Sequence, residues 1–407
     1  MSITDVLSLP DDASRAFAER VAALAEALRS AHHARSGRPG APVEVLEGPS
    51  HGTFELTVPT DAPAGTAAVI RTSGSTGMPK RTALPASALA ASAQSTREYL
   101  GGDGHWLLAL PLHYVAGLAV VSRALLGRVN GAAARLATLD LTRSFTAEHF
   151  VGATGVLRRA AGPGERLYTS LVPTQLTRLL HTDIGIEALR EYSAVLVGGG
   201  RTPEPTRVAA AEAQLPVVYT YGSAETCGGC VYDGVALPGV TVAEVGGRLR
   251  LGGDMVASEY LSDTERTREH FVTAADGTRF YITDDLGTVA NGVVSVTGRT
   301  DDVINTGGVK VSAQAVQQVV ECVDGVGSVL IIGVADPVWG QKVAMGWEPA
   351  PGVGHEKYEA VEASALAAAR DALGGPATPR LVRRYVSLPR LGNGKPDRIT
   401  IANDLSD

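Results

Sequence analysis

Residues 71–80 read Arg-Thr-Ser-Gly-Ser-Thr-Gly-Met-Pro-Lys and follow the strand-like run 67–70. The glycines allow tight turns that leave backbone N–H groups unshielded, and the hydroxyl groups and the lysine supply further donors. Such a loop could wrap the oxygens of a polyphosphate. It is not a Walker A loop, because Pro79 directly precedes Lys80 and no Gly-Lys-Ser/Thr ends the run. A flexible surface turn is the alternative that Ser/Gly composition alone would allow.

Charged side chains stand in three later motifs. Glu225 lies in the segment 221–226, Tyr-Gly-Ser-Ala-Glu-Thr, and its carboxylate suits Mg²⁺, although an acid at a helix start would also explain it. Asp285 lies in the segment 281–287, Tyr-Ile-Thr-Asp-Asp-Leu-Gly, where surface ion pairing is the alternative to ligand binding. Lys395 sits on a Gly/Asn turn from which it can project, and a solvated lysine near the chain end is the alternative.

Arg123 stands inside the apolar helix expected over residues 118–126. An unpaired buried charge is very costly, so this arginine needs a partner. A bound anion would be a functional partner. An arginine that snorkels to the surface, or pairs with a nearby carboxylate, would be a structural one. The residues alone leave both interpretations open.

The elements that must position these residues alternate along the middle of the chain. Strand-like runs at 168–172, 194–197 and 217–220 are each followed by turns and helix-like runs. This order predicts βαβ units, whose ligands bind at the carboxyl ends of the strands. The triplet Gly198-Gly199-Gly200 stands at one such end, where the backbone could approach a planar ring closely.

The two ends of the chain differ from this middle. Residues 12–35 predict an amphipathic helix, and residues 86–99 predict another. After Gly234, short alternating runs predict a β-rich subdomain with a turn at Asn291-Gly292. The segment 298–302 resembles a domain boundary, after which a small α+β unit follows.

The composition is that of a globular protein with two or more domains. The chain has 407 residues, 44% of them hydrophobic, with a formal charge of -7, which argues against a nucleic-acid-binding surface. No apolar run reaches membrane-spanning length, and the N-terminus lacks the order of a signal peptide. Three cysteines cannot form a disulfide framework. We therefore expect no membrane insertion and a cytoplasmic location, and the oligomeric state stays open, a homodimer included.

Taken in this order, the motifs resemble those of the acyl-adenylate-forming superfamily, which includes acyl-CoA synthetases, peptide-synthetase adenylation domains and luciferases. The resemblance covers residues 67–400 or so. Asp284 in place of the usual glycine, Ala224 where threonine or serine is commoner, and a short N-terminal region depart from the pattern. The resemblance implies an α/β fold with a large N-terminal adenylate-forming domain (1–300), which has parallel-type sheets and a β-rich subdomain. A small, mobile α+β C-terminal domain (301–407) would follow.

Within the superfamily, the segment 110–118, Leu-Pro-Leu-His-Tyr-Val-Ala-Gly-Leu, and the short chain resemble the o-succinylbenzoate–CoA ligases of menaquinone biosynthesis. That group usually has histidine where Tyr114 stands, so His113 is displaced by one position, and either ring could line the acyl pocket. Its members also tend to have a basic residue at the position of Arg123. The resemblance implies that Arg123 pairs with the aromatic carboxylate of a substrate that has two carboxylates.

The resemblance also implies the reaction. A carboxylate attacks the α-phosphate of ATP to give acyl-AMP and pyrophosphate, and the thiol of coenzyme A then gives acyl-CoA and AMP. Such catalysis depends on positioning and charge stabilisation, without a protein nucleophile. Lys395 would stabilise the charge on the α-phosphate, Glu225 would bind Mg²⁺, and Asp301 would be the hinge residue. The resemblance further implies that the phosphates are bound by Thr72, Ser73, Gly74, Ser75, Thr76, Gly77 and Lys80. Adenine and ribose would contact Gly198, Gly199, Gly200, Tyr221, Gly222, Asp285 and Arg299. The loop on the coenzyme A side would contain Gly307, Gly308 and Lys310.

Two other interpretations compete with this one. The chain could adenylate another aryl, fatty or amino acid, or it could bind a nucleotide without catalysis.

Cys227 and Cys230 form a Cys-x-x-Cys pair, a pattern found in redox and zinc sites, but the chain has only one further cysteine and no histidine at ligand spacing. Because the pair follows Glu225 directly, we expect it to line the acyl pocket as small apolar residues.

Overall fold

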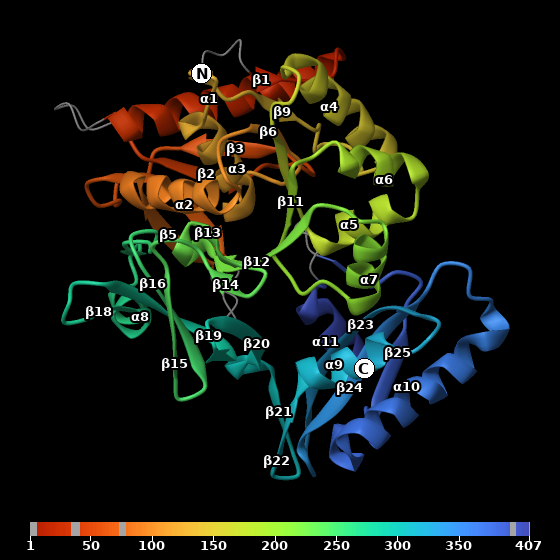
Figure 1. The fold of residues 1–407 in the computed structure, drawn as a ribbon. Helices are drawn as coiled ribbons and strands as arrows, with labels where there is room; N and C mark the ends of the chain where they lie inside the picture. The colour runs from red at the N-terminus through yellow and green to blue at the C-terminus, as the bar shows by residue number, and fades with distance from the viewer. Residues whose placement is uncertain (1–5, 34–40, 73–78, 391–395, 407) are drawn as a thin grey trace.

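The computed structural model describes residues 6–33, 41–72, 79–390 and 396–406, which form a large N-terminal domain and a smaller C-terminal one (Figure 1). The core of the large domain extends along the chain to Val294, and the cores of the small domain begin at Ile304. The predicted fold class is therefore confirmed. The division between residues 300 and 301 stays a prediction, which the positions of these two core residues support.

The large domain is built around a long sheet whose first half is parallel. From the edge inward, this half runs β1 (Val6–Leu7), β9 (Leu136–Thr138), β6 (His105–Leu108), β10 (Leu167–Leu171), β11 (Ala194–Val197) and β12 (Val217–Ser223). Strands β6, β10 and β11 are buried along their whole length, as is typical of parallel strands covered by helices on both faces.

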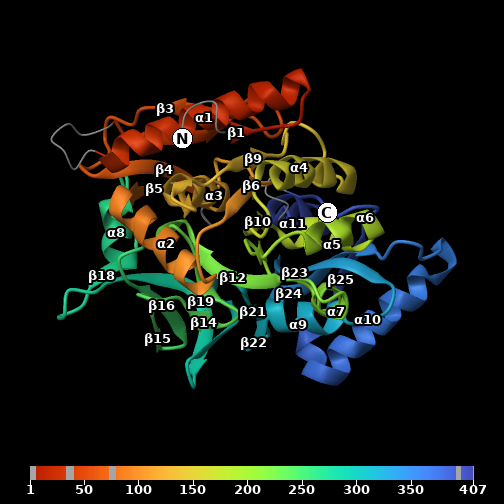
Figure 2. The ribbon, with the colours of Figure 1, turned by 45° about the horizontal axis from the view of Figure 1, so that its top comes forward.

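Helices cover this parallel half from two sides (Figures 1 and 2). On one side lie α2 (Ala86–Tyr99) and α3 (Val115–Leu126). On the other lie α4 (Ala147–Ala160), α5 (Pro173–Leu180), α6 (Asp183–Arg190) and α7 (Glu204–Glu212). The alternation of strand and helix that the sequence predicts for this region is thus confirmed, and the strands end at one common edge of the sheet.

Beyond β12 the same sheet continues with antiparallel strands. In spatial order they are β13 (Gly228–Tyr232), β14 (Val235–Ala236), β20 (Val293–Arg299), β19 (Arg279–Ala290), β16 (Arg248–Gly252) and β15 (Thr241–Val245), with β18 (Phe271–Thr273) beside β19 and α8 (Thr264–His270) before β18. Asn291 and Gly292 have φ values of 52° and 78°. These left-handed values fit a tight two-residue hairpin turn, which confirms the predicted β-rich part and its turn.

A second sheet carries the strands that flank the stretch 71–80. Its order is β17 (Glu259–Tyr260), β5 (Lys80–Pro85), β4 (Thr66–Thr72), β2 (Val43–Glu47) and β3 (Phe54–Thr57). Helix α1 (Asp12–His33) packs on β2 and β4 through the predicted apolar face, in which Phe17, Val21, Leu24 and Leu28 are buried. A two-stranded ribbon of β7 (Arg128–Val129) and β8 (Ala132–Ala133) follows α3.

The small domain begins after the one-turn helix η4 (Thr300–Asp302). Its sheet runs β22 (Val309–Ser312), β21 (Val303–Thr306), β24 (Gly340–Pro349) and β23 (Val326–Asp336), and β25 (Leu381–Arg384) pairs with β24. Its helices are α9 (Ala313–Glu321), α10 (Tyr358–Leu373) and α11 (Arg398–Ser406). Strands β24 and β25 are parallel and joined through α10, so this part forms a βαβ unit.

Strand β24 is one of the elements of the small domain that the sequence analysis did not predict. Val343, Met345 and Trp347 belong to one core, whereas Ala344 faces a second core on the opposite side of the sheet. A central strand buried on both faces shows no alternation of apolar and polar residues, so the period of two that marks half-buried strands is missing.

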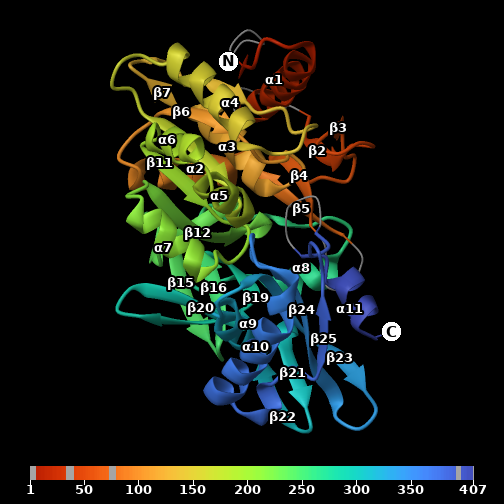
Figure 3. The same ribbon diagram turned by 90° about the vertical axis from the view of Figure 1, so that its right-hand side faces the viewer.

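The small domain presents different elements to the two ends of the molecule. Helix α11 lies on the side that faces the large domain, whereas the tip of the β21–β22 hairpin points away from it (Figures 1 and 3). Gly307 and Gly308, with φ of 59° and 82°, form the turn of that hairpin. The start of α11 is therefore on the side of the large domain in this arrangement, and the tip of the hairpin is not.

Candidate active site

Glu225 lies where the parallel half of the long sheet meets the antiparallel half. Strand β12 ends at Ser223, the one-turn helix η3 (Ala224–Thr226) follows, and Cys227 closes it with a left-handed φ of 52°. This turn reverses the chain into β13. The side chain of Glu225 is buried, with the residue only 4% exposed. A buried carboxylate needs hydrogen-bond donors, and the structure supplies one.

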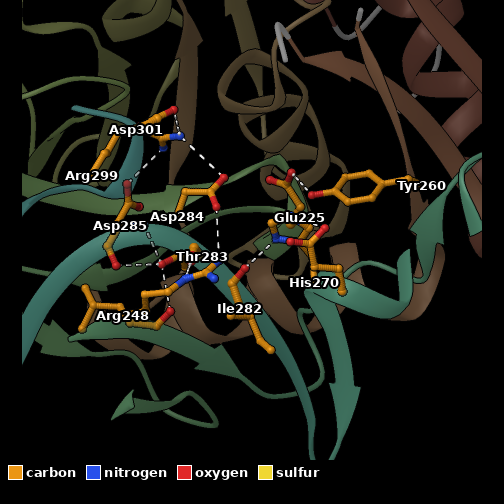
Figure 4. Close-up of polar contacts among 12 residues, drawn as sticks. Glu225, Arg248, Tyr260, His270, Ile282, Thr283, Asp284, Asp285, Arg299 and Asp301 are labelled. Atoms are coloured by element: carbon orange, nitrogen blue, oxygen red, sulfur yellow. Dashed lines mark hydrogen bonds and ion pairs between the residues drawn. The ribbon is translucent and has the colours of Figure 1, made fainter. Parts of the chain in front are cut away.

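Tyr260 connects Glu225 with the end of the stretch 71–80. Its hydroxyl group donates to Oε1 of Glu225 over 2.7 Å (Figure 4). Nζ of Lys80 lies 5.2 Å from the centre of the same ring. Pairing between Tyr260 and Thr82 fixes its place beside β5. Burial, together with the charge of Glu225, raises the pKa of Tyr260, so its hydroxyl remains a donor. One phenol thus contacts two of the predicted site residues.

The carboxylate of Glu225 suits a divalent cation whose other ligands come from the substrate and from water. Among the described residues, no group of three His, Cys, Asp or Glu side chains could hold a metal ion. Mg²⁺ commonly binds through one or two carboxylates while phosphate oxygens and waters complete its shell. A single buried carboxylate, linked through Tyr260 to Lys80, fits that binding mode, and it does not fit a metal held by protein ligands alone.

The predicted ribose contacts lie together. Asp285 accepts a hydrogen bond from the hydroxyl group of Tyr221 at 2.6 Å. It accepts another from Nη1 of Arg299 at 3.1 Å (Figure 4). Asp285 and Arg299 face each other across β19 and β20, so the sheet register sets this pair. Burial and the charge of Asp285 raise the pKa of Tyr221. The three side chains form one connected group at the carboxyl end of β12.

Arg299 also reaches the predicted hinge residue. Its Nε and Nη2 donate to the two carboxylate oxygens of Asp301 at 2.8 and 3.0 Å. Asp284, which departs from the family pattern, accepts a hydrogen bond from Nη2 of Arg248 at 3.1 Å and lies 3.6 Å from Arg299 (Figure 4). The additional carboxylate is therefore neutralised by two guanidinium groups.

The glycines predicted to lie beside adenine are needed for different structural reasons. A Cβ atom on Gly198 would lie 2.2 Å from a threonine side chain of β12, and one on Gly222 would lie 2.2 Å from the carbonyl oxygen of Gly228. Packing between strands therefore demands glycine at both places. Gly199 has a left-handed φ of 80°, and a Cβ on Gly200 would meet no atom within 4 Å. The turn after β11 thus presents bare backbone to open space.

Of the residues predicted to bind the phosphates, the structure describes only Thr72 and Lys80, at the two ends of the loop. Ser73, Gly74, Ser75, Thr76 and Gly77 lie outside the described residues. Thr72 ends β4 and Lys80 begins β5, and these two residues pair across the antiparallel ladder. The roots of the loop are therefore held side by side.

Glu44 on β2 binds the arginines that flank these roots. Its carboxylate accepts hydrogen bonds from Nε of Arg71 at 2.9 Å and from Nε and Nη2 of Arg81 at 2.9 and 2.8 Å. Arg71 and Arg81 are directly opposite each other in the ladder, where like charges repel. Glu44, only 3% exposed, removes that repulsion. No motif in the sequence indicates this clamp.

We expect Glu44→Gln to lower the free energy of unfolding by about 1–3 kcal/mol at neutral pH, because a buried, charge-assisted acceptor is lost. Burial alone would raise the pKa of Glu44, but the hydrogen bonds from Arg81 and Arg71 outweigh it and hold the pKa below its ordinary value of 4.5. The stabilisation is therefore complete above pH 4.5 and is lost as the pH falls below it. Urea unfolding of both proteins from pH 8 to pH 3 checks this. A difference that grows toward acid would contradict the assignment.

Arg123 is buried, and no described residue supplies it with a carboxylate partner. It is 8% exposed, and no acidic side chain of the described residues lies within ion-pair distance. Its Nη2 donates to the hydroxyl group of Tyr232 at 3.2 Å, its guanidinium group lies 5.5 Å from the ring centre of Trp106, and its buried Nε has no acceptor. A Cβ on Gly228 would lie 3.8 Å from Nη2, which places the guanidinium group beside the chain that follows Glu225. Both structural explanations, snorkelling and a nearby carboxylate, are thus wrong.

The two rings that follow β6 lie against each other. The ring centres of His113 and Tyr114 are 4.2 Å apart. His113 is 7% exposed, neither of its ring nitrogens has a hydrogen-bond partner, and burial lowers its pKa. Tyr114 precedes α3 and is less buried, and its pKa is raised by burial to about 12. A neutral imidazole with two unused nitrogens therefore stands at the start of the helix that carries Arg123.

Cys227 and Cys230 are both buried beside η3 and β13. Burial raises the pKa of both thiols, that of Cys230 to about 12. The two therefore behave as small apolar groups, and both belong to the core of the large domain. Their lining of an acyl pocket stays a prediction.

The predicted residues of the small domain are divided between its two ends. Asp301 lies in η4 between the domains, and Asp302 beside it forms a 2.5 Å ion pair with Arg398 at the start of α11. Gly307 and Gly308 lie in the remote turn of the β21–β22 hairpin. Lys310 follows them as an exposed residue of β22. Lys395 lies outside the described residues.

Comparison with known proteins shows the family of the chain. The sequence pattern of the family described as AMP-binding enzymes matches residues 13–294. A probable 2-succinylbenzoate–CoA ligase of Mycobacterium tuberculosis is 38% identical over 339 residues, which are 82% of this chain and 83% of that protein.

Solved structures show the same fold. The ATP-bound MatB of Rhodopseudomonas palustris superimposes with a TM-score of 0.70 at 24% identity, covering 86% of this chain and 70% of that one. The o-succinylbenzoate CoA synthetase (MenE) of Bacillus subtilis, in complex with the acyl-adenylate intermediate OSB-AMP, gives 0.66 at 23% identity, covering 85% and 71%. No helix in the described part of the chain has the length and apolarity needed to cross a membrane. From the sequence match and the identity to the mycobacterial protein, it follows that the chain belongs to the family of AMP-binding enzymes.

Proposed function

We propose that this chain is an ATP-dependent acid–thiol ligase. It would adenylate o-succinylbenzoate and pass the acyl group to coenzyme A, as the names of its relatives say of those proteins. The observation that carries the choice of acid is Arg123, a buried guanidinium group beside Gly228 for which no described residue supplies a carboxylate. o-Succinylbenzoate has two carboxylates, so one can react with ATP while the other pairs with Arg123.

In the first half-reaction the succinyl carboxylate attacks the α-phosphate, and pyrophosphate leaves. Thr72, Lys80 and the intervening loop would hold the β- and γ-phosphates, and Asp285 would accept hydrogen bonds from the ribose hydroxyls. Lys395 would offset the negative charge that builds on the α-phosphate oxygens. The cation held by Glu225 would neutralise phosphate charge. The chain then needs to supply only orientation and fixed charges.

Tyr221 and the glycine turn would hold the adenine. The ring of Tyr221 is fixed at its far end by the hydrogen bond to Asp285, so one side chain orients both the base contact and the ribose contact. The turn Gly198-Gly199-Gly200 would form the other wall of the adenine pocket. The hydroxyl of Tyr260 keeps one oxygen of Glu225 engaged and leaves the other for the cation.

In the second half-reaction the thiol of coenzyme A attacks the acyl carbon, and AMP leaves. The small domain would turn about Asp301, which would carry Lys395 out and bring Gly307, Gly308 and Lys310 toward the entering thiol. The arrangement described here, with α11 toward the large domain, suits the first half-reaction. The proposal locates the reaction in the cytoplasm and does not require a homodimer.

A direct assay tests the proposal. Purified protein with o-succinylbenzoate, ATP, Mg²⁺ and coenzyme A should release AMP and pyrophosphate in equal amounts and form the acyl-CoA. A panel of aryl, fatty and amino acids, screened by pyrophosphate exchange, serves as the comparison. Exchange with another acid but none with o-succinylbenzoate would replace the substrate and keep the reaction type. Absence of exchange with every acid would contradict the enzymatic assignment.

Tyr260→Phe tests the support of the cation site. The substitution keeps the ring beneath Lys80 and removes the hydroxyl that holds Glu225, so we expect the Mg²⁺ concentration for half-maximal pyrophosphate exchange to rise about tenfold or more. Tyr385→Phe is the matched control, because Tyr385 makes the same kind of bond to Asp404 in the small domain. Equal Mg²⁺ requirements in both variants would show that the Tyr260 bond does not serve the cation.

A further inference from the structure

The partner of Arg123 is itself part of a chain of hydrogen bonds. Arginine can only donate, so the hydroxyl oxygen of Tyr232 accepts from Nη2 of Arg123. The same hydroxyl group shares a second hydrogen bond with Oγ1 of Thr96 at 3.1 Å, in which either group can donate. The hydroxyl group of Tyr232 is therefore held between Arg123 and Thr96.

Tyr232 is rigidly placed at the centre of this chain. It is completely buried, it pairs with Thr220 across β12 and β13, and its ring meets the edge of the Tyr99 ring at 5.1 Å. Arg123 comes from α3 and Thr96 from α2, so a strand residue holds two helices at one point. A tyrosine fixed on all sides can hold a guanidinium group in a single orientation.

The contacts of Arg123 leave part of the guanidinium group unused. Tyr232 takes Nη2 and Trp106 lies against one face of the group, while the buried Nε has no acceptor. The unused donors are more than nine-tenths buried and belong to a cation, so they call for an anion, which binds best when two N–H groups are presented in a fixed plane.

We propose that Tyr232 is a positioning residue that sets the selection of dicarboxylate over monocarboxylate acids. This inference rests on the proposed function and deepens it. The tyrosine hydroxyl fixes the plane of Arg123, so that the aromatic carboxylate meets preoriented donors without an ordering cost at the time of binding. Tyr232 does not touch the reacting atoms, and its effect belongs to acid binding.

The experiment compares Tyr232→Phe with the parent in pyrophosphate exchange. The two probes are o-succinylbenzoate and 4-oxo-4-phenylbutanoate, which lacks the aromatic carboxylate. We expect the KM for o-succinylbenzoate to rise about 10- to 100-fold, the range for a lost hydrogen bond to a charged group. The KM for 4-oxo-4-phenylbutanoate and the KM for ATP should not change. A merely structural role would move all three constants together.

Tyr99→Phe is the matched control, because it removes a hydroxyl from the same pair of rings but one that bonds to Asp233 at an exposed position. Its constants should equal those of the parent. An unchanged KM for o-succinylbenzoate in a folded Tyr232→Phe protein would overturn this inference alone. A parent that gives exchange with other acids but not with o-succinylbenzoate would overturn the proposed substrate and this inference with it.

Discussion

Arg123→Met should reduce kcat/KM for o-succinylbenzoate by about 30- to 1,000-fold without weakening the fold. Removal of one partner of a buried charge pair costs about 2–4 kcal/mol of binding, which gives the loss of activity. In the free protein the same arginine has no carboxylate partner among the described residues, so methionine of similar length should leave the free energy of unfolding unchanged or raise it by about 1–4 kcal/mol. Exchange kinetics and urea unfolding measure the two quantities.

The test is specific because the activity should fall while the free energy of unfolding does not. An arginine that only supports packing would lower stability when replaced and would affect every acid alike. Arg128→Met is the control, because Arg128 is an exposed arginine just beyond the same helix. A variant of Arg123 that keeps the preference of the parent for o-succinylbenzoate over 4-oxo-4-phenylbutanoate would contradict the proposed role of this residue.

Lys395→Ala should slow formation of the acyl-adenylate by about 10²- to 10³-fold, as expected for loss of a group that stabilises transition-state charge. Its second half-reaction should be nearly unaffected, because the proposed domain turn carries Lys395 away before the thiol attacks. Rapid-quench measurement of acyl-AMP formation, and separately of acyl-CoA formation from supplied acyl-AMP, distinguishes the two steps.

Two lysines of the small domain provide the comparison. Lys310→Ala should show the reverse pattern, with normal adenylate formation and slow transfer to coenzyme A. Lys357→Ala, at an exposed site before α10, should leave both steps unchanged. Equal losses in both half-reactions for Lys395→Ala would mean that the small domain does not alternate between two arrangements.

Local patterns in the sequence were sufficient for much of the fold. The amphipathic face of α1, the buried runs of β10 and β11 and the Asn291-Gly292 turn each depend on neighbours within a few residues, and the structure confirms them. Strand β24 was missed because both of its faces are buried, which removes the alternation that reveals a strand.

The supporting side chains of the site could not be predicted in this way. Tyr260 contacts a residue 35 positions away, Glu44 binds arginines 27 and 37 positions away, and Tyr232 meets Arg123 across 109 positions. Such contacts arise from sheet register and helix packing, which no local spacing records.

Arg299 donates hydrogen bonds to both carboxylate oxygens of Asp301 and, through its remaining nitrogen, to Asp285. One side chain therefore contacts both the proposed hinge and the proposed ribose site. If the ribose of a bound nucleotide hydrogen-bonds to Asp285, Arg299 binds only Asp301 at the hinge. When the nucleotide leaves, Asp285 binds Arg299 again. The small domain would then sense whether AMP is still present. Such an enzyme would release its spent nucleotide and reset its shape as a single linked event.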